Sequence, residues 1–389
     1  MDPIHNPYAP GAGNPPPELA GRNEPLEKAR VALLRIASGH FGRSLILAGL
    51  RGTGKTVLLN RIRQEAERAN MITIRVEVPE GRSLPSLLAP GLKSALVKLS
   101  RGKAATELIM RSFRALASFV KIMRIKYGDV ELGLDVEPES DSLISPDLSD
   151  SLSQLFQLVG EAAKEKKTAV VLFIDELQVL DEKQLAALIM ALHVAAQDLL
   201  PITMMAAGLP QIRAKMGKAK TYAERLFEFP EIGPLDLNAA KQALVIPAKK
   251  LDICYTAPAL TEILRQTQGY AYFIQEWGKH TWDVAKTSPI TEKDAKEATI
   301  HAIADLDASF FRVRFDQLTS AQRHYLRAMA ELGPNIALSG QIAKQLGKKV
   351  TDVGPIRDQL INKGLIYSPA HGETTFTVPL FDSFMKRMM

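Results

Sequence analysis

The sequence predicts an α/β fold with a parallel β-sheet, followed by an all-helical domain and a smaller C-terminal unit. Short apolar runs alternate with helical stretches between Ser44 and Ala207, which is typical of βαβ units and a parallel sheet. From about Leu235 the strand signals stop, and apolar residues recur at helical spacing instead. The pattern therefore predicts two domains of different class before a third unit begins near Leu318.

Composition excludes several classes of protein. The 389 residues allow two or three domains, and 46% hydrophobic with 24% charged residues is typical of folded chains. Cys254 is the only cysteine, so an internal disulfide is excluded and a reducing compartment is favoured. No apolar run reaches the ~20 residues of a membrane span, and the first 17 residues lack a secretory signal. We expect a cytoplasmic protein without membrane association, whose charge of +6 permits a polyanionic partner.

The expected elements follow in chain order. Residues 1–22 are rich in proline and glycine, so we expect an extended strap on a folded surface or a disordered tail. The sheet domain, 23–234, begins with a helix after Gly21-Arg22-Asn23 and has predicted strands at 44–48, 72–78, 169–174 and 202–207. Its further helices are predicted at 55–70, 152–166 and 184–199. The helical domain, 235–317, has predicted helices at 238–250, 257–268, 270–287 and 291–315.

An insert at 91–150 separates its charges along the chain. Nine basic residues and one acid lie between Gly91 and Tyr127, whereas Gly128 to Asp150 holds eight acids and no base. Apolar residues alternate with acids after Gly128-Asp129, which predicts a hairpin. We favour a basic strand that pairs with an acidic one. A loop that contacts DNA or a protein partner is the alternative.

A glycine-rich motif predicts phosphate binding. Gly49-Leu50-Arg51-Gly52-Thr53-Gly54-Lys55-Thr56 matches G-x-x-x-x-G-K-[ST] between a predicted strand and a predicted helix. Its three glycines let the backbone adopt positive φ and bring amides against phosphate oxygens, and the helix adds its positive N-terminus. Lys55 can reach the β- and γ-phosphates and Thr56 can bind Mg²⁺. We predict that Gly49 to Val57 bind nucleotide, and a chance glycine turn is the less favoured interpretation.

A carboxylate pair, Asp175-Glu176, ends the predicted strand 169–174. Ligands of parallel sheets bind at that edge, so Asp175 can hold Mg²⁺ through water and Glu176 can polarise an attacking water as general base. Capping of the following helix is the alternative role. A guanine-reading motif is absent, because Asn362-Lys363-Gly364-Leu365 lacks the final Asp, so adenine is favoured.

These two motifs, with the helical domain and the C-terminal unit, resemble the AAA+/STAND P-loop ATPases. Archaeal-type ATPases and origin-recognition initiator-like ATPases are the most similar groups. The resemblance implies a helical lid, ATP and ADP as ligands, and a homo-oligomer. It also implies that Arg22 lines the adenine pocket and that Arg225 is an arginine finger for a neighbouring subunit. An ion pair of Arg225 with Glu224 or Glu228 is the alternative.

Two segments depart from the family pattern. The fourth strand ends in Met204-Met-Ala-Ala-Gly-Leu-Pro210 without the usual polar sensor. Gly269-Tyr-Ala-Tyr272 stands where the lid usually carries a sensor arginine. Both departures indicate slow hydrolysis.

The C-terminal unit, 318–389, predicts a winged helix-turn-helix. Helices are expected at 319–333, at 339–347 with Ser339 as cap, and at 350–362, before a two-stranded wing at 364–367 and 374–378. Nine basic and five acidic residues from Thr319 onward favour duplex DNA as the partner, with protein docking as the alternative. DNA contacts are expected from Lys348, Lys349, Arg357 and Lys363.

The leading hypothesis is an ATPase that uses Lys55, Glu176 and Arg225 in catalysis and holds Mg²⁺ with Thr56 and Asp175. Its nucleotide state would control a DNA- or partner-binding surface. The first alternative is a STAND-type switch with slow hydrolysis and a protein-docking winged helix. The second is a DNA-binding regulator with a structural nucleotide site.

Overall fold

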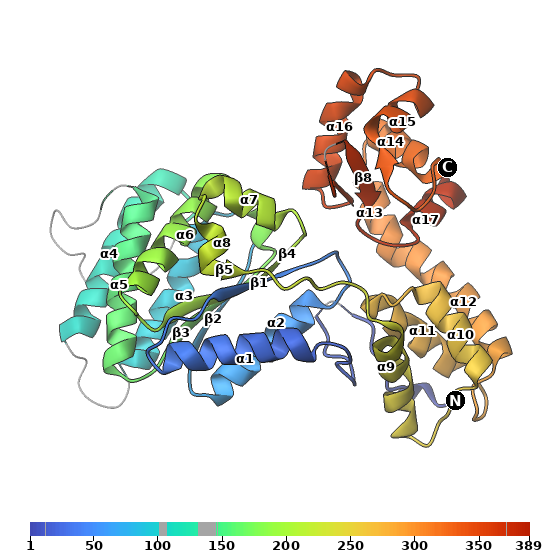
Figure 1. Ribbon diagram of the computed structural model, residues 1–389, viewed down its shortest axis with the longest axis horizontal. Coiled ribbons are helices and arrows are strands. Elements are labelled where there is room, and N and C mark those ends of the chain that lie inside the picture. Colours follow the sequence, from blue (N-terminus) through green and yellow to red (C-terminus); the bar gives the residue numbers. More distant parts are fainter. Residues whose placement is uncertain (12, 101–106, 131–144, 146, 371) are drawn as a thin grey trace. The chain divides into compact units, whose positions relative to one another are not determined.

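The computed structural model describes residues 1–11, 13–100, 107–130, 145, 147–370 and 372–389 (Figure 1). The described residues form two compact units. The sheet unit comprises Arg22–Gly49 and Lys55–Glu231, and the helical unit comprises Met1–Gly21, Leu50–Gly54 and Ile232–Met389. No helix in these described ranges is long and apolar enough to cross a membrane.

The sheet unit is built on five parallel strands in the order β2-β3-β4-β1-β5. The strands are β1 (Ser44–Ala48), β2 (Ile72–Glu77), β3 (Val170–Asp175), β4 (Ile202–Gly208) and β5 (Phe227–Glu228). The predicted parallel sheet is confirmed. The sequence pattern does not show β5, because a strand of two residues has no periodicity to detect.

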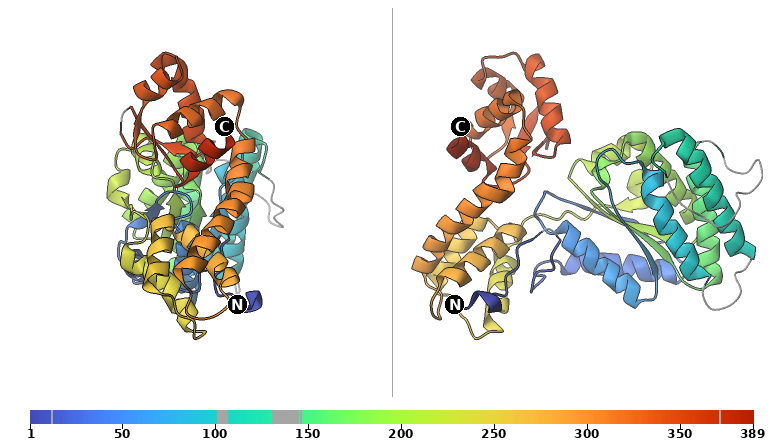
Figure 2. Two further views of the ribbon diagram at one scale, coloured as in Figure 1. Left: turned by 90° about the vertical axis from the view of Figure 1, so that its right-hand side faces the viewer. Right: turned by 180° about the vertical axis from the view of Figure 1, so that it is seen from behind.

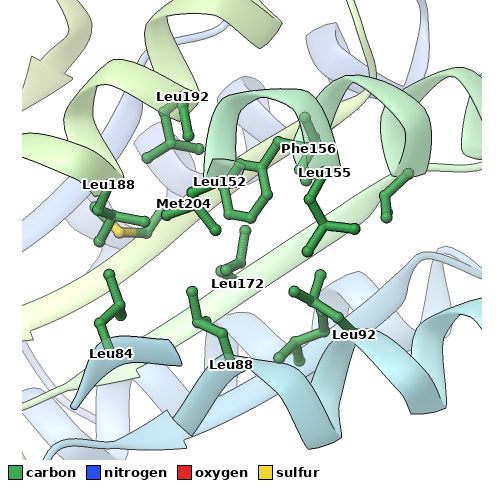
Figure 3. Packing of buried hydrophobic residues seen from close by; sticks show 14 of the residues in the cluster. Leu84, Leu88, Leu92, Leu152, Leu155, Phe156, Leu172, Leu188, Leu192 and Met204 are labelled. Carbon is green, nitrogen blue, oxygen red and sulfur yellow. The ribbon is translucent and has the colours of Figure 1, made fainter. Parts of the chain in front are cut away.

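Both faces of the sheet are covered by helices. The helices of this unit are α1 (Asn23–Ala37), α2 (Lys55–Arg68), α3 (Leu84–Leu99), α4 (Glu107–Tyr127), α5 (Leu148–Glu165), η2 (Leu177–Val179), α6 (Glu182–Gln197), α7 (Ile212–Ala219) and α8 (Ala223–Leu226). Even-numbered residues of β1 to β4, such as Leu172 and Met204, belong to one apolar cluster with α3, α5 and α6 (Figure 3). Side chains alternate along a strand, so the odd-numbered residues face the opposite side, where α1 and α2 lie (Figure 1).

The insert is helical where the structure describes it. Helix α4 packs on α3 and α5 as an outer layer (Figure 2). The expected basic strand is therefore wrong for residues 107–127. Basic residues such as Arg111, Arg114 and Arg124 occupy the exposed side of an amphipathic helix whose other side is buried. The acidic side of the expected hairpin, 131–144, lies outside the described residues.

The helical unit begins with a bundle. Its elements are η1 (Pro3–His5), α9 (Leu237–Lys249), α10 (Ala257–Thr267), α11 (Ala271–Val284), α12 (Glu292–Asp305), the π-helix η3 (Leu306–Phe311) and α13 (Arg312–Asp316). The helix predicted at 291–315 is therefore interrupted by a π-helix. The N-terminal segment lies on the bundle, where Tyr8 is buried and its hydroxyl donates to the carbonyl oxygen of Leu244.

The rest of the helical unit is a small module of helices and a three-stranded sheet. It contains α14 (Ser320–Glu331), β6 (Ala337–Leu338), α15 (Ser339–Gln345), α16 (Val350–Asn362), β7 (Ile366–Tyr367), β8 (Glu373–Phe376) and α17 (Phe381–Met388), with strand order β6-β8-β7. Three helices and a hairpin occur at the predicted positions. The predicted cap at Ser339 is wrong, because Ser339 is the first residue of α15 and its hydroxyl donates to Gly372.

Candidate nucleotide-binding site

The glycine-rich loop, residues 49–56, joins β1 to α2. Gly52 and Gly54 have φ angles of 81° and 92°, a region that residues with a Cβ rarely adopt. A Cβ at position 52 would also lie 3.0 Å from Cε1 of Tyr270. Both positions thus favour glycine, and such positive φ angles are typical of loops whose backbone amides bind an anion.

Gly49 differs from its expected role. It is not among the residues with positive φ, and its amide donates to the carbonyl oxygen of Gly208 at 3.1 Å. The expectation of positive φ at Gly49 is therefore wrong. Gly49 continues the pairing of β1 with β4, and its amide takes part in the hydrogen bonding of the sheet.

Thr56 and Asp175 meet where the loop enters α2. Oγ1 of Thr56 donates a hydrogen bond of 2.6 Å to Oδ2 of Asp175, although 119 residues separate them. Asp175 ends β3 and is only 9% exposed, and Lys55 is 7% exposed. Hydroxyl and carboxylate oxygens are ligands that Mg²⁺ prefers. The described residues contain no group of three or more His, Cys, Asp or Glu that could hold a metal ion.

Glu176 follows in a left-handed conformation, with φ 54° and ψ 38°. Such a conformation is uncommon outside glycine and concentrates at functional sites. The backbone amide of Glu176 donates to Oδ1 of Asp175 at 2.9 Å. Neither carboxylate caps a helix, because Glu176 makes no capping bond to η2 and Asp181 caps α6. The capping alternative is thus not realised.

Gln178 was missed by the sequence analysis. Its Nε2 donates to Oε2 of Glu176, and its Oε1 accepts the amide of Leu209 at 3.0 Å, just beyond the end of β4. Lys215 of α7 donates to the Gln178 carbonyl oxygen at 2.7 Å, and burial lowers the pKa of this lysine. Gln178 therefore links the carboxylate of Glu176 to the β4 end, where the sequence has no polar residue. In the sequence, the apolar end of β4 was the only indication that a polar side chain from another element reaches this place.

Arg22 and Arg225 lie at other places in the sheet unit. Arg22 is buried and immediately precedes the first residue of α1. Arg225 is exposed on α8 and borders an open groove of about 410 Å³ together with Phe41 and Tyr222. Across the described ranges Arg225 forms no ion pair, and Glu228 pairs instead with Lys28 at 3.1 Å. The ion-pair alternative for Arg225 is therefore not formed.

The four predicted DNA contacts divide into two pairs. Lys348 and Lys349 are exposed just before α16. Arg357 instead donates to Oγ1 of Thr374 at 3.0 Å, and Lys363 donates to the carbonyl oxygen of Gln317 at 2.8 Å. Arg357 and Lys363 thus hold the module together, whereas Lys348 and Lys349 extend from its surface.

Comparisons with known proteins agree with this geometry. Residues 18–205 match the family model of the AAA ATPase domain, and residues 308–385 match a domain of unknown function (DUF8462). No curated protein matches the chain.

Among solved structures, the Walker-type ATPase PABY2304 of Pyrococcus abyssi has a TM-score of 0.56 and 15% identity, over 95% of this chain and 96% of that one. The Orc1 protein of Aeropyrum pernix in complex with DNA has a TM-score of 0.47 and 14% identity, over 96% and 95%. The RuvB Holliday junction branch migration motor of Thermotoga maritima has a TM-score of 0.45 and 15% identity, over 94% and 95%. The likeness to the Pyrococcus protein shows the fold alone.

Replacing Gln178 by leucine should destabilise the turn after β3. The acceptor for the amide of the buried Leu209 and the donor to Glu176 would both be lost, at a cost of about 1–3 kcal/mol. Hydrogen exchange of the Leu209 amide should accelerate, and the midpoint of urea unfolding should fall. Gln197→Leu, at an exposed position, is the matched control. Unchanged exchange at Leu209 would mean that Gln178 does not hold this end of β4.

Proposed function

We propose, on the premise that residues 18–205 are an AAA ATPase domain, that this chain binds ATP with Mg²⁺ and hydrolyses it slowly. We further propose that its nucleotide state controls binding of duplex DNA by the C-terminal module. The hydrogen bond of 2.6 Å between Thr56 and Asp175, directly after the glycine-rich loop, is the observation that carries the proposal. It brings the two expected Mg²⁺ ligands to the end of the phosphate-binding loop.

Different residues bind the nucleotide and take part in its hydrolysis. The loop amides, the N-terminus of α2 and Lys55 would hold the phosphates, and Arg22 would line the adenine pocket. Thr56 and Asp175 would hold Mg²⁺, which would supply positive charge beside the phosphates. Glu176 accepts a proton from the attacking water as general base. The hydrogen bond from Gln178 orients that carboxylate.

Slow turnover is supported by two features of the site. The residues at the end of β4 are apolar, so their side chains cannot orient the attacking water. The Gln178 side chain reaches the end of β4, but its oxygen accepts the Leu209 amide. The residues at the start of α11 are also uncharged. Fewer hydrogen-bond donors held in place beside the charge that develops in the transition state mean a higher activation barrier for hydrolysis.

The C-terminal module is proposed to be a winged helix that binds DNA. The three helices α14, α15 and α16 and the hairpin of β7 and β8, with Lys348 and Lys349 exposed beside α16, support this proposal. Protein docking in a STAND-type switch is the second candidate. It is favoured by the internal hydrogen bonds of Arg357 and Lys363, which leave fewer cations for phosphate contacts.

Variants at Lys55 and Glu176 separate binding from chemistry. Lys55→Ala should abolish binding of MgATP in a calorimetric titration, because a buried cation at the phosphates is lost. Glu176→Gln should retain ATP within about threefold of wild-type affinity and lower turnover on the order of 100-fold or more, because the general base is removed. Equal ATP affinity of wild type and Lys55→Ala would refute the site.

Complementation between variants tests Arg225. If Arg225 acts on a neighbouring chain, Arg225→Ala and Glu176→Gln should each hydrolyse ATP poorly, but a mixture should exceed both. A mixed interface unites an intact Glu176 from one chain with an intact Arg225 from the other. Arg213→Ala, from the same region of the sheet unit, is the control. A mixture with only the averaged activity would exclude a role of Arg225 between subunits.

Lys348→Ala/Lys349→Ala tests the DNA proposal by fluorescence anisotropy with random duplex across a salt series. Each phosphate contact contributes a slope of about −0.9 in the logarithmic salt plot, so the double variant should bind more weakly with a slope reduced by about 2. Arg357→Ala is unsuitable as a control, because it opens the hairpin. Lys296→Ala on exposed α12 serves instead. No binding by wild type at low salt, with or without ATP, would favour protein docking.

A further inference from the structure

A lysine from another element holds the turn that follows β3. Lys215 of α7 donates hydrogen bonds to the carbonyl oxygen of Gln178, at 2.7 Å, and to that of Leu180. Both carbonyls lie at the end of η2, where the last carbonyl groups of a helix lack a partner within it and a lysine can bond to them. Helix α7 packs on η2 and α6 within the sheet unit, so it is held beside the turn that its lysine contacts.

The charge of Lys215 is partly withdrawn from water at this place. Burial lowers the pKa of its amine, and the negative charges of Asp181 and Glu182 oppose that shift only in part. A buried ammonium group is costly unless it donates hydrogen bonds to acceptors that are held near it. The two carbonyl oxygens of the turn are such acceptors, and they explain how the half-buried side chain is accommodated.

The same turn carries Glu176, the proposed general base, in a strained backbone conformation. Its left-handed backbone, with φ 54°, persists only where surrounding contacts hold it. The side-chain amide of Gln178 donates to the Glu176 carboxylate, while the backbone carbonyl oxygen of Gln178 accepts from Lys215. At the far end of the turn, Asp181 caps α6. Lys215 therefore acts on the carboxylate of Glu176 through Gln178.

We infer that Lys215 is a positioning residue for ATP hydrolysis, which fixes the turn after β3 so that the Glu176 carboxylate can accept a proton from the attacking water. The inference rests on the proposed function, because it assumes that Glu176 is the general base. A displacement of about 1 Å at a reacting group can lower a rate ~100-fold. Lys215 therefore influences turnover and not nucleotide binding, since other residues would hold the phosphates and Mg²⁺.

Lys215→Met tests the inference by separating turnover from binding. The variant keeps a long unbranched side chain but loses the donors, so kcat for ATP hydrolysis should fall about tenfold or more. The dissociation constant for Mg-ATPγS, measured by calorimetric titration of the full chain, should stay within about twofold of wild type. Lys215→Arg keeps a cation with donors and should recover part of the turnover. Lys218→Met, exposed on the same helix, is the matched control and should change neither quantity.

A double variant separates positioning from general destabilisation. If Lys215 acts through the Glu176 carboxylate, adding Lys215→Met to Glu176→Gln should lower kcat no further, because the effects of coupled residues do not add. The same fractional loss of kcat in both backgrounds, or turnover of Lys215→Met equal to wild type, would overturn the inference. If Lys215→Met does not fold by circular dichroism, the shorter Lys215→Gln carries the test with the same expected result. A wild-type chain that does not hydrolyse ATP would instead refute the proposed function on which the inference rests.

Discussion

The parallel pairing of β1, β4 and β3 is the constraint on which the candidate site depends. Ala48 pairs with Gly208, and Ile174 pairs with Ala206, so the ends of three strands lie at one edge. A slip of one residue would exchange the side chains that face the two layers of helices, and burial on both faces prevents it. The register thereby brings the loop after β1 within reach of the carboxylate that ends β3. The bond between Thr56 and Asp175 is its consequence.

At the end of β4, the missing side chain of Gly208 leaves space for the side chain of Gln178. A Cβ at Gly208 would lie 2.9 Å from Oε1 of Gln178, so the glycine makes room for the glutamine. Gln178 then accepts the Leu209 amide and donates to Glu176. The apolar end of β4 and the polar Gln178 on the turn after β3 are therefore joined by direct contacts. The carboxylate of Glu176 is positioned by a residue only two places further along the chain.

Two aromatic residues, Tyr270 and Tyr272, contact Gly52 of the glycine-rich loop. Burial raises the pKa of Tyr270 and Tyr272, so both phenols stay neutral beside a region built for anions. The Tyr270 hydroxyl donates to the carbonyl oxygen of Thr377 at 2.9 Å, and Phe311 packs on α17. The segments that contact the loop therefore also contact the C-terminal module.

The sequence by itself determined strands β1 to β4, the glycine-rich loop and the carboxylates at 175 and 176. These are local signals, since a buried strand shows as an apolar run and a phosphate loop as glycines before a helix. Only the tertiary structure decided the helical form of α4, the hydrogen bond of the Gly49 amide within the sheet, and the contacts of Gln178. Gln178 meets a partner 31 residues away, and the amide of Gly49 meets the carbonyl oxygen of Gly208 on a different strand. The periodicity of apolar residues shows which face of a segment is buried, but the tertiary packing determines which element lies against that face.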